Sequence, residues 1–519
     1  MKKRITIILF ALTAINVSAS TPTIQWQKSL GGSGNDRAYS IAQTNDGGYV
    51  VTGIATTADG DVTVNHGSND FWLVKLDSAG TKKWQKSYGG SGNETPNSVI
   101  QTSDGGYLMA GSSSAADGDV TKNYGTDDVW LVKTDSAGTL QWQKSYGGSG
   151  SEYALFVAQA TDGNYLFVGY STSSDSDLTI NHGGYDCWVV KTDTAGTILW
   201  KKTYGGSGND FTKSVQPTSD GGCIISGETS SSDGDITGSH GGTDLWLIKL
   251  DTAGTIKWQK VYGGSGSDGA RFAEQTADGG YIATGYSNST NGDVTGNHGN
   301  TDAWVLKTDS AGIIQWQKSL GGSNSDDACV VHATTDGGYM VAAFTGSTDG
   351  DVTSNHGGND YWVVKLDSTS SPVWQKTFGG TNNDRATSLQ LTTDGGIVVS
   401  GYSSSTDVDV TGNHGSSDFW VVKLTRDSLL TANTEHSSVN NQENISIYPN
   451  PASAAFTISS EGRKIKEITV VNISGEIVYR SVIDNFQTRI DLSKEAKGIY
   501  IIKITDNNNN ETNKKIILQ

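Results

Sequence analysis

One stretch of the chain decides its fold: Trp26 to Lys83 reads WQKSLGGSGNDRAYSIAQTNDGGYVVTGIATTADGDVTVNHGSNDFWLVKLDSAGTKK. Related stretches follow at a constant step of 58 residues. All 14 Trp of the chain fall into two series with that step, one from Trp26 and one from Trp72. A repeat of this length predicts that each unit is one supersecondary element whose apolar face is covered by its neighbours.

Each repeat predicts four short strands. In the first repeat we place them at Ala38–Gln43, Tyr49–Gly53 and Phe71–Leu76, with the fourth around Trp84. The sequence Asn45-Asp46-Gly47-Gly48 joins the first two as a hairpin, because Asp-Gly readily adopts positive φ angles. The third strand is apolar on both faces, as a strand between packed sheets should be. The fourth alternates in polarity and should form a half-exposed outer edge.

The two ends of the array distinguish a closed ring from an open solenoid. The strand around Trp26 precedes the first complete set of three strands, and no fourth strand follows Trp420. The first strand can therefore complete the last unit, and closure hides the sheet edges that an open array would expose. We predict an all-β fold: a seven-bladed β-propeller of 58-residue, four-stranded repeats over residues 23–430, followed by a small C-terminal β-sandwich.

Composition agrees with this fold and excludes some partners. The 519 residues include 66 Gly but only 6 Pro, and 34 % are hydrophobic, which excludes collagen and long amphipathic helices. The formal net charge is −18, almost all of it before residue 437, which argues against nucleic acid or an anionic membrane as a partner. Cys187, Cys223 and Cys329 are odd in number and far apart, so we expect buried free thiols.

The first residues, MKKRITIILFALTAINVSAS, have the layout of a secretory signal peptide. A basic start precedes an apolar run that is too short to span a membrane, and small residues place the cleavage after Ala19. We therefore expect residues 1–19 to be removed and the mature chain to be exported, monomeric and without a transmembrane segment.

Composition changes after a polar linker, which we place at residues 431–444. Residues 445–519 lack Trp, contain many Ile and have a balanced charge. Apolar residues alternate on both sides of Gly475 and predict a hairpin within a small β-sandwich.

Both regions resemble known families. The recurring pattern GGSGND…DGGY…D.W.VK.D.AGT resembles the SBBP-type β-propeller repeat of bacterial exported proteins, a likeness that implies an architecture but no fixed substrate. Residues 445–519 resemble the type A C-terminal sorting domain of the type IX secretion system of Bacteroidetes. The matching residues are Tyr448, Pro449, Asn450, Pro451, Gly475, Gly498, Tyr500, Lys514 and Lys515.

The second resemblance implies export in two steps. The leader directs the chain to the periplasm, and the type IX machinery, which would be a partner, then carries it across the outer membrane. The cargo is attached to the cell surface or released. An ordinary accessory sandwich domain is the alternative for residues 445–519.

The long loops between the second and third strands are the predicted binding face, because long loops on one side of a rigid ring are where ligands bind. An Asp recurs in every loop, and a His recurs in every loop but the second, which has Tyr. The binding-face candidates are Asp61, His66, Asp119, Tyr124, Asp177, His182, Asp235, His240, Asp293, His298, Asp351, His356, Asp409 and His414.

Two interpretations of the loop carboxylates stay open. Asp59-Gly60-Asp61 supplies two closely spaced carboxylates, which could contribute to a calcium site. Alternatively, these side chains satisfy loop amides in Asx-turns, in which case no cofactor is needed. One His per blade is too widely spaced for a shared metal ion, so we expect the His residues to stabilise the loops.

Further acids recur two residues before each Trp of the Trp72 series, as Asp70, and in each GGSGND segment, as Asp36. Acids that are identical in all blades favour a structural role, since a catalytic pair needs two different environments. No nucleophile elbow, HExxH or phosphate-binding lysine loop is present, and we assign no catalytic residue.

The sequence thus predicts a secreted or cell-surface module that binds a glycan or a protein without catalysis. One alternative is a polysaccharide-degrading enzyme with its active site in the central pocket. The other is a structural spacer at the cell surface.

Overall fold

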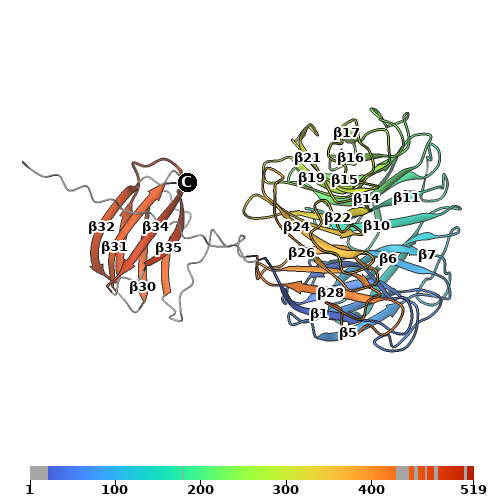
Figure 1. Cartoon of the computed structure of the whole chain (residues 1–519), viewed down its shortest axis with the longest axis horizontal. Helices are drawn as coiled ribbons and strands as arrows, with labels where there is room; N and C mark the ends of the chain where they lie inside the picture. The colour runs from blue at the N-terminus through green and yellow to red at the C-terminus, as the bar shows by residue number, and fades with distance from the viewer. Residues whose placement is uncertain are drawn as a thin grey trace, which may run out of the picture. The chain divides into compact units, whose positions relative to one another are not determined.

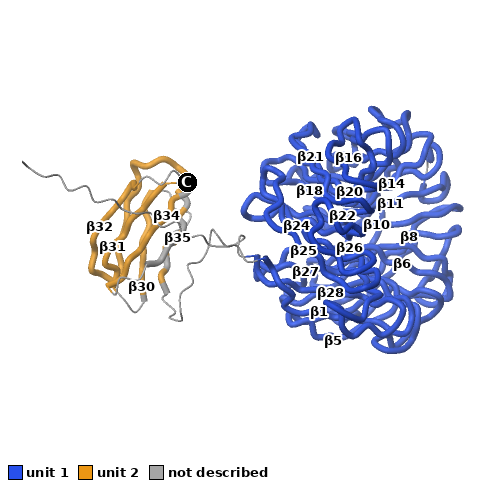
Figure 2. Tube along the Cα trace, viewed as in Figure 1, with its two compact units in different colours: residues 1–433 blue, residues 434–519 orange. Residues whose placement is uncertain are grey.

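The computed structural model describes residues 21–178, 180–427, 444–448, 454–461, 464–472, 477–507 and 511–518. It divides into two compact units, residues 1–433 and 434–519 (Figure 2). The predicted signal peptide with its cleavage site after Ala19, and residues 431–443 of the predicted linker, lie outside the described residues. The described part of the chain contains no helix with the length and hydrophobicity that a membrane span requires.

The first unit consists of seven antiparallel four-stranded sheets in chain order, which confirms the predicted propeller (Figure 1). Its strands are β1 (Ile24–Leu30); β2 (Arg37–Gln43), β3 (Tyr49–Ala55), β4 (Asp70–Leu76) and β5 (Lys82–Tyr88); β6 (Glu94–Gln101), β7 (Tyr107–Ser113), β8 (Asp128–Thr134) and β9 (Leu140–Tyr146); β10 (Glu152–Gln159), β11 (Tyr165–Ser171), β12 (Asp186–Thr192) and β13 (Ile198–Tyr204); β14 (Asp210–Pro217), β15 (Cys223–Thr229), β16 (Asp244–Leu250) and β17 (Ile256–Tyr262); β18 (Asp268–Gln275), β19 (Tyr281–Ser287), β20 (Asp302–Thr308) and β21 (Ile314–Leu320); β22 (Asp326–Ala333), β23 (Tyr339–Thr345), β24 (Asp360–Leu366) and β25 (Pro372–Phe378); and β26 (Asp384–Leu391), β27 (Ile397–Ser403) and β28 (Asp418–Leu424).

We number the blades 1 to 7, from β2–β5 to β26–β28, and β1 completes blade 7. The strand order in that blade is β1-β28-β27-β26, and the blue β1 lies beside the orange β28 in Figure 1. Trp26 pairs with Lys423, and the indole nitrogen of Trp420 donates a hydrogen bond of 2.8 Å to Gln27. At the inner strands, the backbone N–H of Ile41 in blade 1 reaches Ser388 Oγ in blade 7 at 3.4 Å. The ring is therefore closed at its outer and inner edges.

The third strand of every blade is buried along its whole length, because each of its faces packs against a different neighbouring blade. In blade 1, Phe71 contacts Trp130 of blade 2, with ring centroids 4.7 Å apart. Trp72 contacts Phe419 of blade 7 on the other face, at 4.6 Å. The indole N–H of Trp72 is satisfied by Gln85 Oε1 at 2.7 Å. The Trp72 series therefore lies in the packed interfaces between blades, where edge-on aromatic contacts add to the burial of apolar surface.

A buried lysine fastens the first hairpin of every blade. Lys75 Nζ donates to Thr44 Oγ1 at 2.9 Å and to the carboxylate of Asp46 at 3.0 Å, so the ammonium group is paired although its side chain is buried. The equivalent ion pairs in blades 2 to 7 are Lys133–Asp104, Lys191–Asp162, Lys249–Asp220, Lys307–Asp278, Lys365–Asp336 and Lys423–Asp394.

The second unit contains a three-stranded and a four-stranded antiparallel sheet. Their strands are, in sheet order, β29 (Asn444–Tyr448), β30 (Ala455–Glu461) and β33 (Gln487–Asp491), and then β32 (Ile477–Asn485), β31 (Ile465–Asn472), β34 (Gly498–Asp506) and β35 (Glu511–Leu518). One core joins side chains of both sheets, among them Phe456, Ile468 and Ile502, as in a β-sandwich.

Five of the nine predicted sorting residues lie in described strands of the second unit. Tyr448 ends β29, Gly498 and Tyr500 begin β34, and Lys514 and Lys515 lie in β35. Pro449, Asn450, Pro451 and Gly475 lie outside the described residues. The strands on either side of Gly475, β31 and β32, pair antiparallel.

Candidate functional site

The first acid of the predicted Asp-Gly-Asp pattern fixes the turn between blades. Asp59 Oδ1 accepts hydrogen bonds from the backbone N–H of Ser33 and from Thr57 Oγ1, both at 2.8 Å. Its Oδ2 accepts from Ser33 Oγ at 2.6 Å. In blade 5, Asn291 makes the equivalent bond to the backbone N–H of Ser265, at 2.8 Å. A neutral amide oxygen therefore serves at this position as well as a carboxylate, which agrees with the Asx-turn interpretation.

The second acid of the pattern braces the same turn. The backbone N–H of Asp61 donates to the carbonyl oxygen of Gly31 at 2.8 Å, and Asp61 Oδ2 accepts from the N–H of Gly31 at 3.3 Å. The other six predicted Asp repeat the backbone bond with the glycines equivalent to Gly31: Asp119, Asp177, Asp235, Asp293, Asp351 and Asp409. Within the described residues, no three His, Cys, Asp or Glu side chains converge as ligands of a metal ion would.

The loop histidines lie against the buried acid that precedes the core Trp. His66 Nδ1 is 2.7 Å from Asp70 Oδ2, and the backbone N–H of His66 donates to the same oxygen at 2.9 Å. The same pairs form in blades 3, 5, 6 and 7 as His182–Asp186, His298–Asp302, His356–Asp360 and His414–Asp418. In blade 4, the backbone N–H of His240 makes the bond at 2.7 Å while its ring lies 3.9 Å from Asp244. In blade 2, only the backbone N–H of Tyr124 reaches Asp128.

Each of these acids also faces a second buried acid in the next blade. Asp70 Oδ1 is buried without a hydrogen-bond partner, and a Cβ on Gly89 would lie 2.7 Å from it and 2.6 Å from Glu94 Oε2. Only glycine fits between the two carboxyl groups. The equivalent pairs in the other blades are Asp128–Glu152, Asp186–Asp210, Asp244–Asp268, Asp302–Asp326, Asp360–Asp384 and Asp418–Asp36.

Burial raises the pKa of the first acid in all seven pairs. The pKa of Asp128 reaches about 7, because burial is reinforced by the charges of Glu152 and Asp177 and no histidine offsets them. The acids and histidines common to the blades therefore form a sevenfold structural framework.

The blades differ from one another at the ends of the inner strands that adjoin the long loops. One ring consists of the residues that follow the inter-blade acid: Arg37, Thr95, Tyr153, Phe211, Gly269, Asp327 and Arg385. A second ring, at the ends of the second strands, consists of Ile54, Ser112, Tyr170, Glu228, Tyr286, Phe344 and Tyr402. Each residue of the first ring is the antiparallel strand partner of the corresponding residue of the second ring, as Arg385 is of Tyr402. We define the loop-face cluster as the aromatic and charged members of these two rings together with the residues that contact them: Asp127, Tyr185, Lys213 and Arg271.

A β-bulge adds a third variable residue to each inner strand. The register shifts after Ala38, so Tyr39 is the extra residue, and all seven inner strands repeat this shift. Bulges re-aim a side chain and are frequent beside functional sites. The bulge residues of blades 4 and 5, Lys213 and Arg271, reach carboxylates of the two rings.

Aromatic rings fill the side of the cluster in blades 3 and 4. Tyr170 contacts Tyr153 and Tyr185 at centroid distances of 5.2 Å and Phe211 at 4.9 Å. Tyr153 Oη donates to Asp127 Oδ2 at 2.8 Å, and burial raises the pKa of Tyr153. All five side chains are half-buried and so keep part of their surface open to solvent.

Ion pairs occupy the cluster in blades 4 to 6. Lys213 Nζ lies 3.2 Å from Glu228, which also accepts a hydrogen bond of 3.0 Å from Tyr286 Oη. Arg271 pairs with Asp327 at 2.9 Å and stacks on Tyr286, 4.9 Å from its centroid. All the carboxylates of this group are thus engaged.

Two arginines at the seam between blades 6, 7 and 1 differ from those cations. The guanidinium of Arg37 lies 4.8 Å from the ring centroid of Tyr402, and that of Arg385 lies 4.5 Å from Phe344. No carboxylate of the described residues makes an ion pair with either arginine. Arg37 Nε is buried and has no hydrogen-bond partner.

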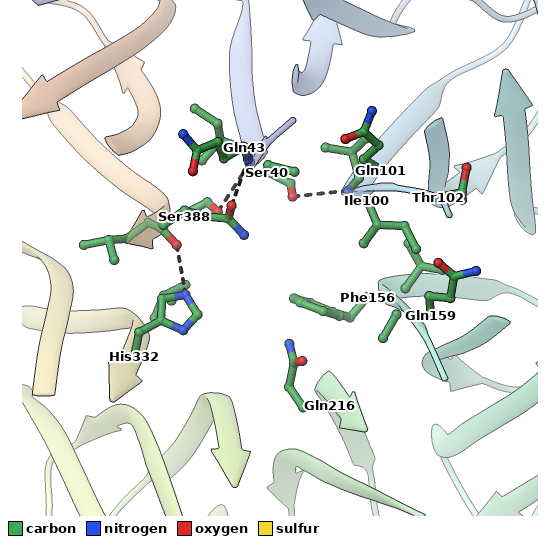
Figure 3. Close-up of a pocket in the computed structure, with 18 of the residues that line it drawn as sticks. Ser40, Gln43, Ile100, Gln101, Thr102, Phe156, Gln159, Gln216, His332 and Ser388 are labelled. Carbon is green, nitrogen blue, oxygen red and sulfur yellow. Dashed lines mark hydrogen bonds between the residues drawn. The ribbon is translucent and has the colours of Figure 1, made fainter. Parts of the chain in front are cut away.

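Below the cluster, all seven inner strands line a cavity of about 470 Å³ (Figure 3). Phe156 and Phe272 approach each other across it from blades 3 and 5, with centroids 5.9 Å apart. Gln216 points into the cavity in Figure 3. His332 is the one ionisable residue among its described lining residues, and its ring nitrogens face Glu274 Oε2 at 2.8 Å and the carbonyl of Leu389 at 3.1 Å.

The sequence predicts binding at the loop face, but the predicted residues do not include those of the cluster. A signal was available: when the seven repeats are aligned on their step, the positions of Arg37, Tyr39 and Tyr402 differ widely in chemistry. Cys329, one of these bulge residues, is half-buried rather than buried like Cys187 and Cys223, and its Sγ lies 3.0 Å from the carbonyl of Ala386.

Comparison with known proteins identifies the second unit. Residues 446–519 match the family described as Secretion system C-terminal sorting domain. The predicted sorting domain is therefore confirmed, and the chain is exported through type IX secretion to the cell surface or the extracellular space. The resemblance of the propeller to the SBBP-type repeat stays a prediction.

Other similarities are partial. Regulatory protein FlaEY of Caulobacter vibrioides is 26% identical over 185 residues, which are 32% of this chain and 19% of that protein. An endo-acting ulvan lyase of Formosa agariphila is 32% identical over 76 residues, 14% of this chain and 15% of the lyase. The chain thus spans less than a fifth of the length of these curated relatives.

Two solved structures illustrate the structural similarities. PorZ, a surface component of the type IX secretion system of Porphyromonas gingivalis, has a TM-score of 0.40 at 10% identity, over 94% of this chain and 60% of PorZ. A fungal alcohol oxidase has a TM-score of 0.46 at 12% identity, over 96% of this chain and 100% of the oxidase.

Proposed function

We propose that the propeller is a monomeric, non-enzymatic module that binds a glycan at the loop-face cluster after export by the type IX machinery. One observation carries this proposal: blade-specific aromatic and charged residues gather at the ends of the inner strands that adjoin the long loops, where most of their side chains are half-buried. Residues that only maintain the fold repeat with the blades. An asymmetric ligand needs an asymmetric set of contacts, and the cluster provides one.

The chemistry of the cluster suits a sugar. Tyr170, Tyr185 and Phe211 offer half-buried ring faces and edges, on which the C–H faces of a sugar ring can pack. The tyrosine hydroxyls and the charged groups beside them can exchange hydrogen bonds with sugar hydroxyls. A protein ligand is the alternative that the experiment below distinguishes.

The polysaccharide-degrading alternative has less support. A glycosidase needs two carboxyl groups free to act on the substrate. In the cluster, Glu228 is held by Lys213 and Tyr286, and Asp327 is held by Arg271. Burial raises the pKa of Tyr286, so its hydroxyl keeps its proton at neutral pH and is not available as a general base. In the cavity below, amides, hydroxyls and apolar side chains predominate.

A structural spacer would explain the sevenfold framework but not the cluster. In a spacer, the residues that differ between blades would have no ligand to contact. Small or aliphatic residues would then be sufficient at these positions. The aromatic contacts of blades 3 and 4 therefore favour a binding role over a spacer.

The full-length protein should be tested on a broad glycan array, with calcium and again with EDTA. We expect selective binding that Tyr170→Ala or Phe211→Ala reduces at least tenfold. Tyr124→Ala, an aromatic change in a long loop outside the cluster, serves as the control and should bind normally. Binding to proteins but to no glycan would contradict the proposal, and so would glycan binding that is lost only in Tyr124→Ala.

A further inference from the structure

We propose that the loop-face cluster selects glycans that carry a carboxylate, and that Arg37 and Arg385 hold it. This inference rests on the proposed function and deepens it by assigning a ligand class. It is argued from the pairing of cations in the propeller, the geometry of the two arginines and the state of the nearby acids.

The two arginines break a rule that the other inner cations obey. The seven buried lysines of the blade hairpins all have a carboxylate partner, as Lys75 does in Asp46. In the cluster, Lys213 and Arg271 are also paired. Burying a charge without a partner is costly, and the side chains of Arg37 and Arg385 are both half-buried. A ligand carboxylate would supply the partner that Arg37 and Arg385 lack within the described residues.

Their geometry suits a planar anion. Arg37 and Arg385 lie in equivalent positions of neighbouring blades, with Tyr402 between them: it is the strand partner of Arg385 and the stacking partner of Arg37. Stacking fixes the plane of each guanidinium and leaves its N–H edge available for hydrogen bonds in that plane. Bidentate pairing with a carboxylate uses this type of edge.

The acids nearest in sequence are held by other groups and form no ion pair with either arginine. Asp36 accepts from the N–H groups of Gly32 at 2.6 Å and Thr56 at 3.0 Å. Asp384 accepts from the N–H of Gly380 at 2.7 Å and from Ser405 at 2.9 Å. Burial raises the pKa of both acids above the ordinary value of an aspartate. The two arginines are therefore left without an ion-pair partner among the described residues of a chain whose net charge is −18.

The aromatic rings in blades 3 and 4 of the loop-face cluster indicate the carrier of the carboxylate. An acidic peptide would need charge and backbone donors, but it would make little use of the ring surfaces of Tyr170 and Phe211 in blades 3 and 4. A uronic acid combines a carboxylate with a sugar ring that can pack on aromatic side chains. We therefore assign a uronate-containing glycan, and sulfated glycans and acidic peptides become outcomes of the test.

The test uses full-length protein, isothermal titration calorimetry and a trimer of galacturonic acid at pH 7. Its fully methyl-esterified form is the matched probe, because it keeps the size and the sugar rings but removes the charge. We expect the trimer to bind at least tenfold more tightly than the ester. Arg37→Ala and Arg385→Ala should each weaken trimer binding about tenfold and leave ester binding unchanged.

Two controls make the result specific. Arg426→Ala removes an arginine outside the cluster, beside Gly395 in a hairpin turn, and should bind like wild type. Arg385→Lys keeps the charge but not the planar fork, and should recover only part of the affinity. Unchanged melting temperatures of the variants show that they fold.

The failures of the two proposals are distinguishable. Equal binding of trimer and ester, or unchanged trimer binding in both arginine variants, overturns the carboxylate inference. If Tyr170→Ala still abolishes binding, the proposed glycan function stands. Preference for a sulfated trimer of galactose, or for a glutamate heptapeptide, also overturns the uronate assignment. Absence of binding to every glycan overturns both proposals.

Discussion

The backbone N–H of Tyr124 donates a hydrogen bond to the buried carboxylate of Asp128, but the Tyr124 side chain offers that carboxylate no positive charge. In five other blades, a histidine ring occupies this place and lies within 2.7 Å of the equivalent Asp. The pKa of Asp128 is accordingly raised to about 7, with burial as the largest cause.

We predict that Asp128 makes the propeller less stable as the pH rises. A group whose pKa is higher in the folded state keeps its proton there while the unfolded chain has lost it. The contribution of Asp128 to the free energy of unfolding is therefore fully present below pH 4 and is lost as the pH rises from about 4 to 7. Tyr124→His should recover about 1 kcal/mol at pH 7.5, the worth of one pKa unit, and change little at pH 4.5. Urea unfolding at the two pH values measures this, with Tyr124→Phe as the control. An equal effect at both pH values would contradict it.

The lysine–hairpin pairs have the opposite pH dependence. The hydrogen bond from Lys307, together with one from Thr276, lowers the pKa of Asp278 to about 2. The stability from such a group is present above the unfolded pKa near 4 and is lost as the pH falls from 4 to 2. We therefore expect the melting temperature of the protein to be highest near pH 4 to 5.

Lys307→Met tests this second dependence, since it keeps most of the apolar stem and removes the charge. The variant should melt lower than wild type at pH 5, and the difference should shrink toward pH 2, as measured by circular dichroism. Lys257→Met, which removes an exposed lysine of an outer strand, is the control. A difference that stays constant from pH 5 to 2 would argue against the ion pair as its source.

Specific residues show how far the sequence could predict the molecule. The Trp step, the Asp-Gly hairpins and the apolar third strand are local signals. The strand ends that they predict in blade 1 lie within two residues of the ends of β2, β3 and β4. The pairs Asp70–Glu94 and Arg37–Tyr402 join different blades, so their contacts follow from how the sheets pack. The cluster was missed because its residues lack a motif and share only a position in seven aligned repeats.

Removal of the closing strand should weaken both the ring and the site. Deletion of residues 23–30 exposes the edge of β28 and the side chains of Phe419 and Trp420, which are buried in the intact blade. We expect the melting temperature to fall by more than about 10 °C. Binding of the galacturonic acid trimer should also weaken, because Arg37 of blade 1 and Tyr402 of blade 7 lie on opposite sides of the junction between these two blades. A synthetic peptide of residues 21–32 should restore part of the stability, and an unchanged melting temperature would contradict the closure.

Truncation of the second unit should stop export without unfolding the propeller. Deletion of residues 514–519 removes much of β35, including the buried Ile516 and Leu518, from the matched sorting domain. We expect the truncated chain to accumulate in the periplasm, as measured by cell fractionation, while the melting transition of its propeller is unchanged. Normal surface display of the truncated chain would show that the end of this domain is dispensable for sorting.

The loop acids provide a direct choice between a hydrogen-bonded turn and a calcium site. Blade 5 already carries Asn291 where other blades carry an acid such as Asp59, and it makes the equivalent bond to the turn. We therefore predict that Asp59→Asn melts within about 1 °C of wild type, whereas Asp59→Ala melts a few degrees lower because the N–H of Ser33 loses its acceptor. EDTA should leave all three melting temperatures unchanged. If calcium were bound by Asp59, EDTA would destabilise wild type, and Asp59→Asn would resemble the alanine variant because a neutral amide is a weaker calcium ligand than a carboxylate.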